Sequence, residues 1–198
     1  MDTLNAKTWD IPIPKELEGI YDEEKYAKAK KYHQATQRIS TLSTIISTVL
    51  TIAVLWWKGF AFVHIYITQF TLSPILQAVL FFGVFAVASS IIGLPFELYS
   101  IFVIEEKFGF NKMTWKTYLS DKIKGILLGA SIGGILLSLF VWFYTIAGTL
   151  FWIYAWILFS AFTLFFSMFY TSIIVPIFNK LNPLEEGKKK KKIELFAK

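Results

Sequence analysis

The sequence predicts an all-α fold, a polytopic membrane helix bundle with four transmembrane helices. Composition is the first reason, because 55% of the 198 residues are hydrophobic and 18% are aromatic. Distribution is the second: the apolar residues fall in long runs with almost no charge, and about 18 or more such residues are typical of a membrane-spanning helix. The third is that these runs lack strand-like alternation and are too few for a membrane barrel.

The four predicted spans cover about 39–57, 72–104, 124–147 and 149–176, within a membrane domain at 39–178. Because about 20 residues cross the hydrocarbon core, each run is long enough, and the longer ones must tilt or extend into water. Residues 1–38 are polar: a linker is followed by a helix that Asp22 caps and that can continue into the first span. A basic tail covers 179–198.

The distribution of charge predicts the orientation of the spans. Nineteen of the 20 lysine and arginine residues lie in 1–38, 107–124 and 180–198, which four spans place on one side. The positive-inside rule makes this side cytoplasmic, so both termini are expected there. The far side then holds the loop 58–71 and a turn at Gly148, and its aromatic belt suits three residues: Trp56, Trp57 and Tyr66.

Glu97 is the one acidic residue within the second span, and it has two interpretations. In the first, Gly93 and Pro95 break the helix and leave Glu97 at the cytoplasmic interface. In the second, its carboxylate faces a polar chamber, because an acid at the bilayer centre costs about 2.5–3.5 kcal/mol.

Two adjacent carboxylates, Glu105 and Glu106, end the same span. They could form a general acid–base pair. Neighbouring residues on a helix point about 100° apart, however, and this favours a structural role. The expected role is to anchor the cytoplasmic end of the helix against nearby lysines: Lys107, Lys112, Lys122 or Lys124.

The four residues after Lys107 are Phe108, Gly109, Phe110 and Asn111, and they predict a turn. Gly109 permits a positive φ angle, and Asn111 suits a turn or a cap. Further on, Asp121 is expected to cap the third span or to pair with Lys124.

Two stripes of small residues predict helix packing. Gly125, Gly129 and Gly133 lie four apart on the third span and allow a close approach of another helix. A hydroxyl stripe on the first span either bonds its own backbone or a neighbouring helix, or lines a water-filled cavity. Its members are Ser40, Thr44, Ser47 and Thr51.

Metal and nucleic-acid binding are not expected in this chain. It has no cysteine, and its two histidines, His33 and His64, lie on opposite sides of the membrane in the predicted topology, which excludes joint zinc binding. Lys188 begins a run of five lysines that ends at Lys192. This run either binds anionic lipid headgroups, at about 1 kcal/mol per residue near the surface, or is a solvated tail.

Several segments resemble the membrane half of the type I CAAX prenyl proteases, which are zinc metalloendopeptidases. The most specific is LPFELYSIFVIEEKFGFN at 94–111, and the others are PIPKEL at 12–17, YDEEKYAKAKKYH at 21–33 and FNKLNPLEEG at 178–187. The residues that carry the signature are Pro95, Glu105, Glu106, Phe108, Gly109, Phe110, Asn111, Asp121, Asn179 and Pro183.

The resemblance implies a non-catalytic role for this chain. The family's zinc-binding His-Glu-x-x-His motif is absent from the sequence, so no cofactor is expected here and zinc is expected in full-length members. The four spans would correspond to the family's second to fifth, would form part of a chamber wall, and would dock the catalytic domain, with the phenyl rings of the turn packed beneath it. We expect an excised or naturally truncated fragment.

Two points stay open at this stage. The expected location is a bacterial inner membrane, or the endoplasmic reticulum or inner nuclear membrane if the source is eukaryotic. The alternative function is a stand-alone membrane scaffold or transporter-like bundle, although transporters usually carry paired intramembrane charges or paired broken helices.

Overall fold

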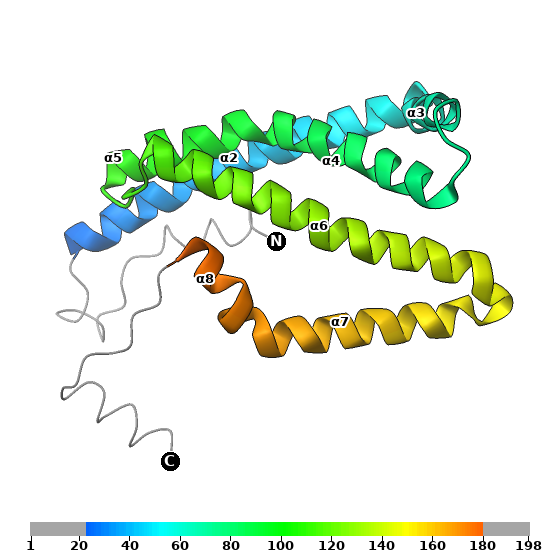
Figure 1. The fold of residues 1–198 in the computed structure, drawn as a ribbon. Helices are drawn as coiled ribbons and strands as arrows, with labels where there is room; N and C mark the ends of the chain where they lie inside the picture. Colours follow the sequence, from blue (N-terminus) through cyan, green and yellow to red (C-terminus); the bar gives the residue numbers. More distant parts are fainter. Residues whose placement is uncertain (1–22, 180–198) are drawn as a thin grey trace, which may run out of the picture. The chain divides into compact units, whose positions relative to one another are not determined.

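The protein is described by a computed structural model of residues 23–179, in which every regular element is helical (Figure 1). This confirms the all-α fold class. The helices are α2 (Glu23–Trp56), α3 (Gly59–Thr68), α4 (Pro74–Tyr99), the π-helix η3 (Ser100–Glu105), α5 (Glu106–Phe108), α6 (Trp115–Ala147), the 3₁₀-helix η4 (Gly148–Leu150), α7 (Phe151–Ile173) and α8 (Val175–Phe178). The predicted linker, the Asp22 cap, Pro183 and the lysine run lie outside the described residues.

Three segments of the described chain are long and apolar enough to cross a membrane: Glu24–Trp56, Pro74–Phe108 and Trp115–Phe178. The third contains both α6 and α7, which η4 joins. Their most apolar stretches are not buried within the structure, as is typical of helices that face lipid or further membrane helices. Four long helices therefore underlie the four predicted spans, and the number of crossings stays a prediction.

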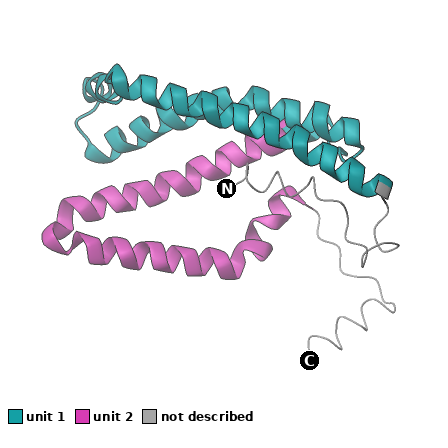
Figure 2. Ribbon diagram, turned by 180° about the vertical axis from the view of Figure 1, so that it is seen from behind, with its two compact units in different colours: residues 1–118 teal, residues 119–198 magenta. Residues whose placement is uncertain are grey.

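The first compact unit ends at Tyr118, and its described part begins with α2 (Figure 2, teal). α2 is one continuous helix, which confirms that the helix predicted after Asp22 continues into the first apolar run. α4, η3 and α5 return alongside it (Figure 1). Among the described residues of this unit, the buried ones are Ile67, Ile104, Phe108 and Tyr118.

The segment predicted as the loop 58–71 contains α3, so that prediction was incomplete. A tight turn separates α2 from α3: Lys58 has a positive φ of 55°, and its N–H donates to the Leu55 carbonyl at 3.1 Å. At Gly59 a Cβ atom would lie 2.9 Å from Val54 Cγ1 and 3.1 Å from the Val54 oxygen. Only glycine fits this close approach of the backbone.

The chain enters α4 through a capped end. The Ser73 hydroxyl accepts the Leu76 N–H at 3.4 Å, and Pro74 occupies the first turn, where its missing N–H costs nothing. The Gln77 side chain donates to the Thr71 carbonyl at 2.8 Å. These bonds fix the direction in which the second apolar helix leaves α3.

The second unit begins at Leu119, and its described part is a hairpin of α6 and α7 followed by α8 (Figure 2, magenta). Gly148 has a φ of 52°, which confirms the predicted turn. Aromatic side chains close this end of the hairpin: the Phe151 ring lies 4.9 Å from Phe140 and 5.3 Å from Tyr144. At the other end, Lys124 Nζ donates to the Ile177 carbonyl at 3.1 Å.

Candidate functional site

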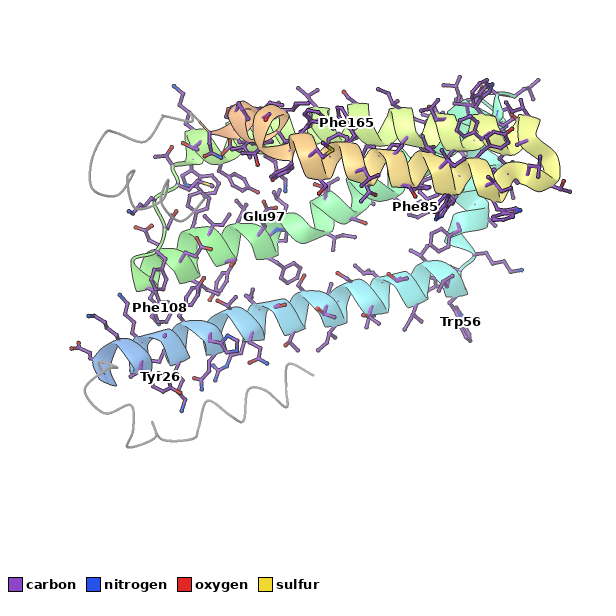
Figure 3. The ribbon with its side chains drawn as sticks, turned by 90° about the horizontal axis from the view of Figure 1, so that it is seen from below. Tyr26, Trp56, Phe85, Glu97, Phe108 and Phe165 are labelled. Carbon is purple, nitrogen blue, oxygen red and sulfur yellow. The ribbon has the colours of Figure 1, made fainter. Side chains whose placement is uncertain are left out.

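The candidate site is the end of the second apolar helix and the turn that leads into α6. It begins inside α4 at Pro95, whose missing N–H leaves the Ile91 carbonyl without its helical donor. The prediction that Gly93 and Pro95 break the helix was wrong, because α4 continues through both to Tyr99. Membrane helices tolerate proline in this way. Glu97 is therefore a helical residue, half-buried (Figure 3).

The helix changes its winding five residues after Pro95. From Ser100 to Glu105 it is a π-helix, with hydrogen bonds from i to i+5. π-Helical segments are rare in proteins, and those that occur are often found at functional sites. Here η3 as a whole packs against α2, Ile104 and Phe108 are both buried, and Phe108 meets Tyr32 of α2.

The chain then turns through a Schellman motif, which confirms the predicted turn. Gly109 has a φ of 75°, its N–H donates to the Glu106 carbonyl at 3.0 Å, and the Phe110 N–H donates to the Glu105 carbonyl at 2.9 Å. The Asn111 N–H reaches the same Glu105 carbonyl at 3.2 Å. Glu105 thus contributes its backbone oxygen to two hydrogen bonds of the turn.

The Asn111 side chain adds two hydrogen bonds to the turn, one from its amide nitrogen and one to its amide oxygen. Its Nδ2 donates to Glu106 Oε2 at 2.9 Å, and its Oδ1 accepts the Met113 N–H at 2.7 Å. Thr114 then caps α6, because its hydroxyl accepts the Thr117 N–H at 3.2 Å.

The two carboxylates do not have the anchoring partners expected of them. Within residues 23–179, neither Glu105 nor Glu106 forms an ion pair with a lysine, and Glu106 instead accepts from Asn111. The expected lysine partners were Lys107, Lys112, Lys122 and Lys124. The geometry favours a structural role in the turn over an acid–base pair, because Glu106 is bound to an amide and Glu105 acts through its carbonyl.

The phenyl rings of the turn pack on α2. Tyr32 meets Phe108 edge-on at 5.5 Å between ring centroids and Phe110 at 4.9 Å. Phe108 is buried between α5 and α2 (Figure 3), and Lys28 Nζ lies 5.5 Å over the Phe110 ring. Phe108 is therefore covered by this chain itself, whereas Phe110 keeps about half of its surface exposed. That the two rings lie beneath a catalytic domain stays a prediction.

A second aromatic contact, which the sequence did not predict, joins η3 to the first turn of α6. The Phe102 and Trp115 rings stack at 4.0 Å and only 6° from parallel, and Tyr118 meets Phe102 edge-on at 5.8 Å. Aromatic pairs contribute about 0.5–1.5 kcal/mol beyond their burial. Since the turn lies between Phe102 and Trp115 in sequence, this stack joins the two segments that flank it.

The hydroxyl stripe on α2 bonds its own backbone at two of its positions. Thr44 Oγ1 donates to the Ser40 carbonyl at 2.9 Å, and Thr51 Oγ1 donates to the Ser47 carbonyl at 2.8 Å. This agrees with the plainer of its two interpretations. All four residues are exposed in the structure.

Asp121 is not a helix cap, because α6 begins six residues earlier at Trp115. It instead pairs with Lys124 at 3.9 Å, the alternative that the sequence allowed. Asn179 follows α8, and its N–H donates to the Val175 carbonyl at 2.9 Å. A methyl group at Gly125, Gly129 or Gly133 would meet no atom within 4 Å in the described structure, so their role in helix packing stays a prediction.

The predicted histidines lie on different helices. His33 is in the first half of α2, and His64 is in α3 rather than in a loop. Within residues 23–179, no group of three His, Cys, Asp or Glu side chains could hold a metal ion. His33 lies 23 residues before the end of α2, a helical rise of about 35 Å, so the two histidines cannot share an ion.

The long apolar helices and the hydrogen-bonded turn at 108–111 define a polytopic membrane protein domain. The family described as CAAX prenyl protease N-terminal, five membrane helices, matches residues 3–180, and the chain belongs to this family. It is the membrane-embedded N-terminal part of that family, as the resemblance in its sequence implied.

Similar proteins cover almost all of this chain. CAAX prenyl protease 1 homologs are 33% identical over 94% of the chain in mouse and 30% identical over its whole length in rice. The crystal structure of Saccharomyces mikatae Ste24p is 31% identical over 97% of the chain, with a TM-score of 0.87. The chain spans less than half of each of these proteins, 41%, 48% and 46% respectively. All three are eukaryotic, so they give no support to a bacterial inner membrane.

Proposed function

We propose that this chain is the non-catalytic membrane portion of a zinc metallopeptidase like the CAAX prenyl proteases. In it, α2, α4, α6 and α7 each cross the bilayer once, with both termini on the cytoplasmic side, and form part of the wall of an intramembrane chamber. One observation carries the proposal: relatives named as CAAX prenyl proteases match almost the whole chain, and it covers less than half of them.

In this proposal, the zinc ion of such an enzyme is held outside residues 23–179. A catalytic zinc needs three protein ligands around one point, and residues 23–179 offer no such group. The metal belongs, in this proposal, to the part of the relatives that the chain does not match. There zinc would polarise the scissile carbonyl and activate water.

The turn at 108–111 is the proposed docking surface for that missing part. Two aromatic contacts hold it, one with Tyr32 on α2 and one in which Phe102 stacks on Trp115. A surface fixed in this way loses little conformational entropy when a partner binds. The groups exposed at and beside this turn include the side chains of Lys107 and Lys112 and the exposed half of the Phe110 side chain.

The first test is the metal content and activity of the purified chain. We expect well below one equivalent of zinc by elemental analysis and no cleavage of a farnesylated CAAX peptide. One equivalent of zinc together with matching activity would sink the non-catalytic assignment.

The second test is co-purification with the separately expressed remainder of a relative such as mouse CAAX prenyl protease 1 homolog. We expect enrichment over an unrelated four-helix membrane protein, and we expect the double variant Lys107→Glu, Lys112→Glu to lower it. The matched control is the substitution Val49→Ala, which lies on α2 far from the turn. Equal recovery for all baits would count against a docking role.

The proposed location is the membrane of the endoplasmic reticulum or the inner nuclear membrane. The support is that the relatives compared above come from eukaryotes. Anionic lipid headgroups are the proposed partners of the lysine run from Lys188 to Lys192, because each lysine near such a surface contributes about 1 kcal/mol.

A further inference from the structure

The segment between α2 and α4 forms a helix that is apolar but too short to cross a membrane. α3 has ten residues, which gives a length of about 15 Å, whereas the hydrocarbon core is about 30 Å thick. It connects two segments that are each long and apolar enough to span. A connection between two consecutive spans must lie at one face of the bilayer.

The direction of α3 differs from that of its neighbours. In Figure 1 it is seen almost end-on, whereas α2 and α4 run across the view. All three belong to the same compact unit. If α2 and α4 cross the bilayer, α3 therefore lies roughly in the membrane plane.

One face of α3 is fixed on the first unit. Phe60 meets Phe85 of α4 at 4.7 Å and Phe81 at 6.2 Å, and Ile67 is buried. Val63, half-buried, lies between them in the helical spacing i, i+3, i+7. These contacts hold the orientation of the helix.

The opposite face of α3 is exposed and apolar. Phe62, Ile65 and Tyr66 lie on it in the spacing i, i+3, i+4 and are all exposed. The same exposed character continues on both sides of the helix. Trp56 and Trp57 are 82% and 77% exposed, Leu72 is 91% exposed, and Trp56 projects away from the end of α2 (Figure 3).

The chemistry of this face fits the boundary between hydrocarbon and headgroups better than bulk water or the bilayer centre. Trp and Tyr concentrate where hydrocarbon meets headgroups, because each has an apolar ring and a polar atom. Lys58, His64 and Gln69 add polar groups to the same short segment. Bulk water does not suit four exposed aromatic rings, and the centre of the bilayer does not suit a lysine.

We propose that α3 is an interfacial helix, which lies in the membrane plane and buries Phe62, Ile65 and Tyr66 at the boundary between headgroups and acyl chains. The partner is the lipid of the leaflet opposite the turn at 108–111. Trp56 and Trp57 extend this anchor to the end of α2. The inference goes beyond the proposed function, but it rests on the proposed crossing of α2 and α4.

The natural absence of cysteine allows a direct measurement. Single cysteines are placed in the full chain at Phe62 and Tyr66, labelled with a nitroxide and reconstituted in phosphatidylcholine vesicles. Collision with oxygen and with a water-soluble nickel chelate then gives the depth of each label. Val49→Cys, on an exposed position of α2, marks the hydrocarbon core, and Ala29→Cys marks water. Phe60→Cys is the control for the docked face.

We expect the labels at 62 and 66 at a depth between those of 49 and 29, with more oxygen than nickel collisions, and an immobile, inaccessible label at 60. Nickel accessibility equal to that at 29 would place α3 in water. Protection from both reagents would mean that protein covers it, and a depth equal to that at 49 would mean insertion into the core. Each of these three results overturns the proposal. A label at 49 that is not in hydrocarbon would instead refute the crossing of α2.

Discussion

At the scale of single residues, the turn at 108–111 depends most on the side chain of Asn111. Its carboxamide is used at both ends, as donor to Glu106 and as acceptor from Met113. The sequence predicted a turn residue at this position, since asparagine suits such turns. It could not predict Glu106 as the partner, because the two side chains meet only when the helix ends in the left-handed conformation of Gly109.

The substitution Asn111→Ala is expected to lower the free energy of unfolding by about 1–2 kcal/mol, because it removes both hydrogen bonds. Asn111→Asp keeps the acceptor for Met113 but brings a carboxylate against Glu106, so it should be no more stable than the alanine variant. Unfolding of the purified chain in detergent micelles measures both. Lys112→Ala, an exposed neighbour, should change the value by less than about 0.5 kcal/mol. An aspartate variant as stable as the parent would show that the Glu106 contact contributes nothing.

At the scale of secondary-structure elements, the π-helix η3 determines how the second apolar helix packs against α2. Hydrogen bonds from i to i+5 wind more residues into each turn, so η3 contains one residue more than an α-helix would need. Ile104 and Phe108 are nevertheless both buried, and Phe108 meets Tyr32 of α2. Val103, which is exposed, is on the outer side of this wider turn.

Deletion of Val103 is therefore expected to convert η3 to α-helix with Ile104 and Phe108 still buried, and to lower the free energy of unfolding by no more than about 1 kcal/mol. Deletion of Ala88 in the regular part of α4 is the matched control. It rotates everything after it by about 100°, which turns both side chains out of their buried positions and should lower the free energy of unfolding by roughly 2–5 kcal/mol. Unfolding in micelles compares the two. Equal losses would show that the packing on α2 requires the π-helix.

Topology is the property of the whole molecule that the charges predict, and it can be measured on intact vesicles. Single cysteines at Ala29, Lys112 and Leu72, all exposed, are treated with a maleimide that does not cross membranes. The sites at 29 and 112 should react from the same side and the site at 72 only from the other, because α2 and α4 each cross once. Reaction of all three from one side would contradict the crossing.

The sequence predicted the helical class and the turns at Gly109 and Gly148 because those features are local: hydropathy sets the spans, and glycine permits the positive φ angles. It missed α3, because ten apolar residues are too few to read as a span. It missed the stack of Phe102 on Trp115 and the contact of Phe108 with Tyr32, because these depend on how α2, η3 and α6 meet in space.

α2 has 34 residues without glycine or proline, and such a helix of about 50 Å bends only gently. Its first half holds the turn through Tyr32, and its end leads directly into α3. The helix therefore works as a stiff rod about 20 Å longer than the hydrocarbon core. If α2 crosses the bilayer and α3 lies at its far interface, as proposed, a partner that pushes on the turn would tilt this rod and move α3 against the opposite leaflet. The two faces of the membrane would then be mechanically coupled through one helix.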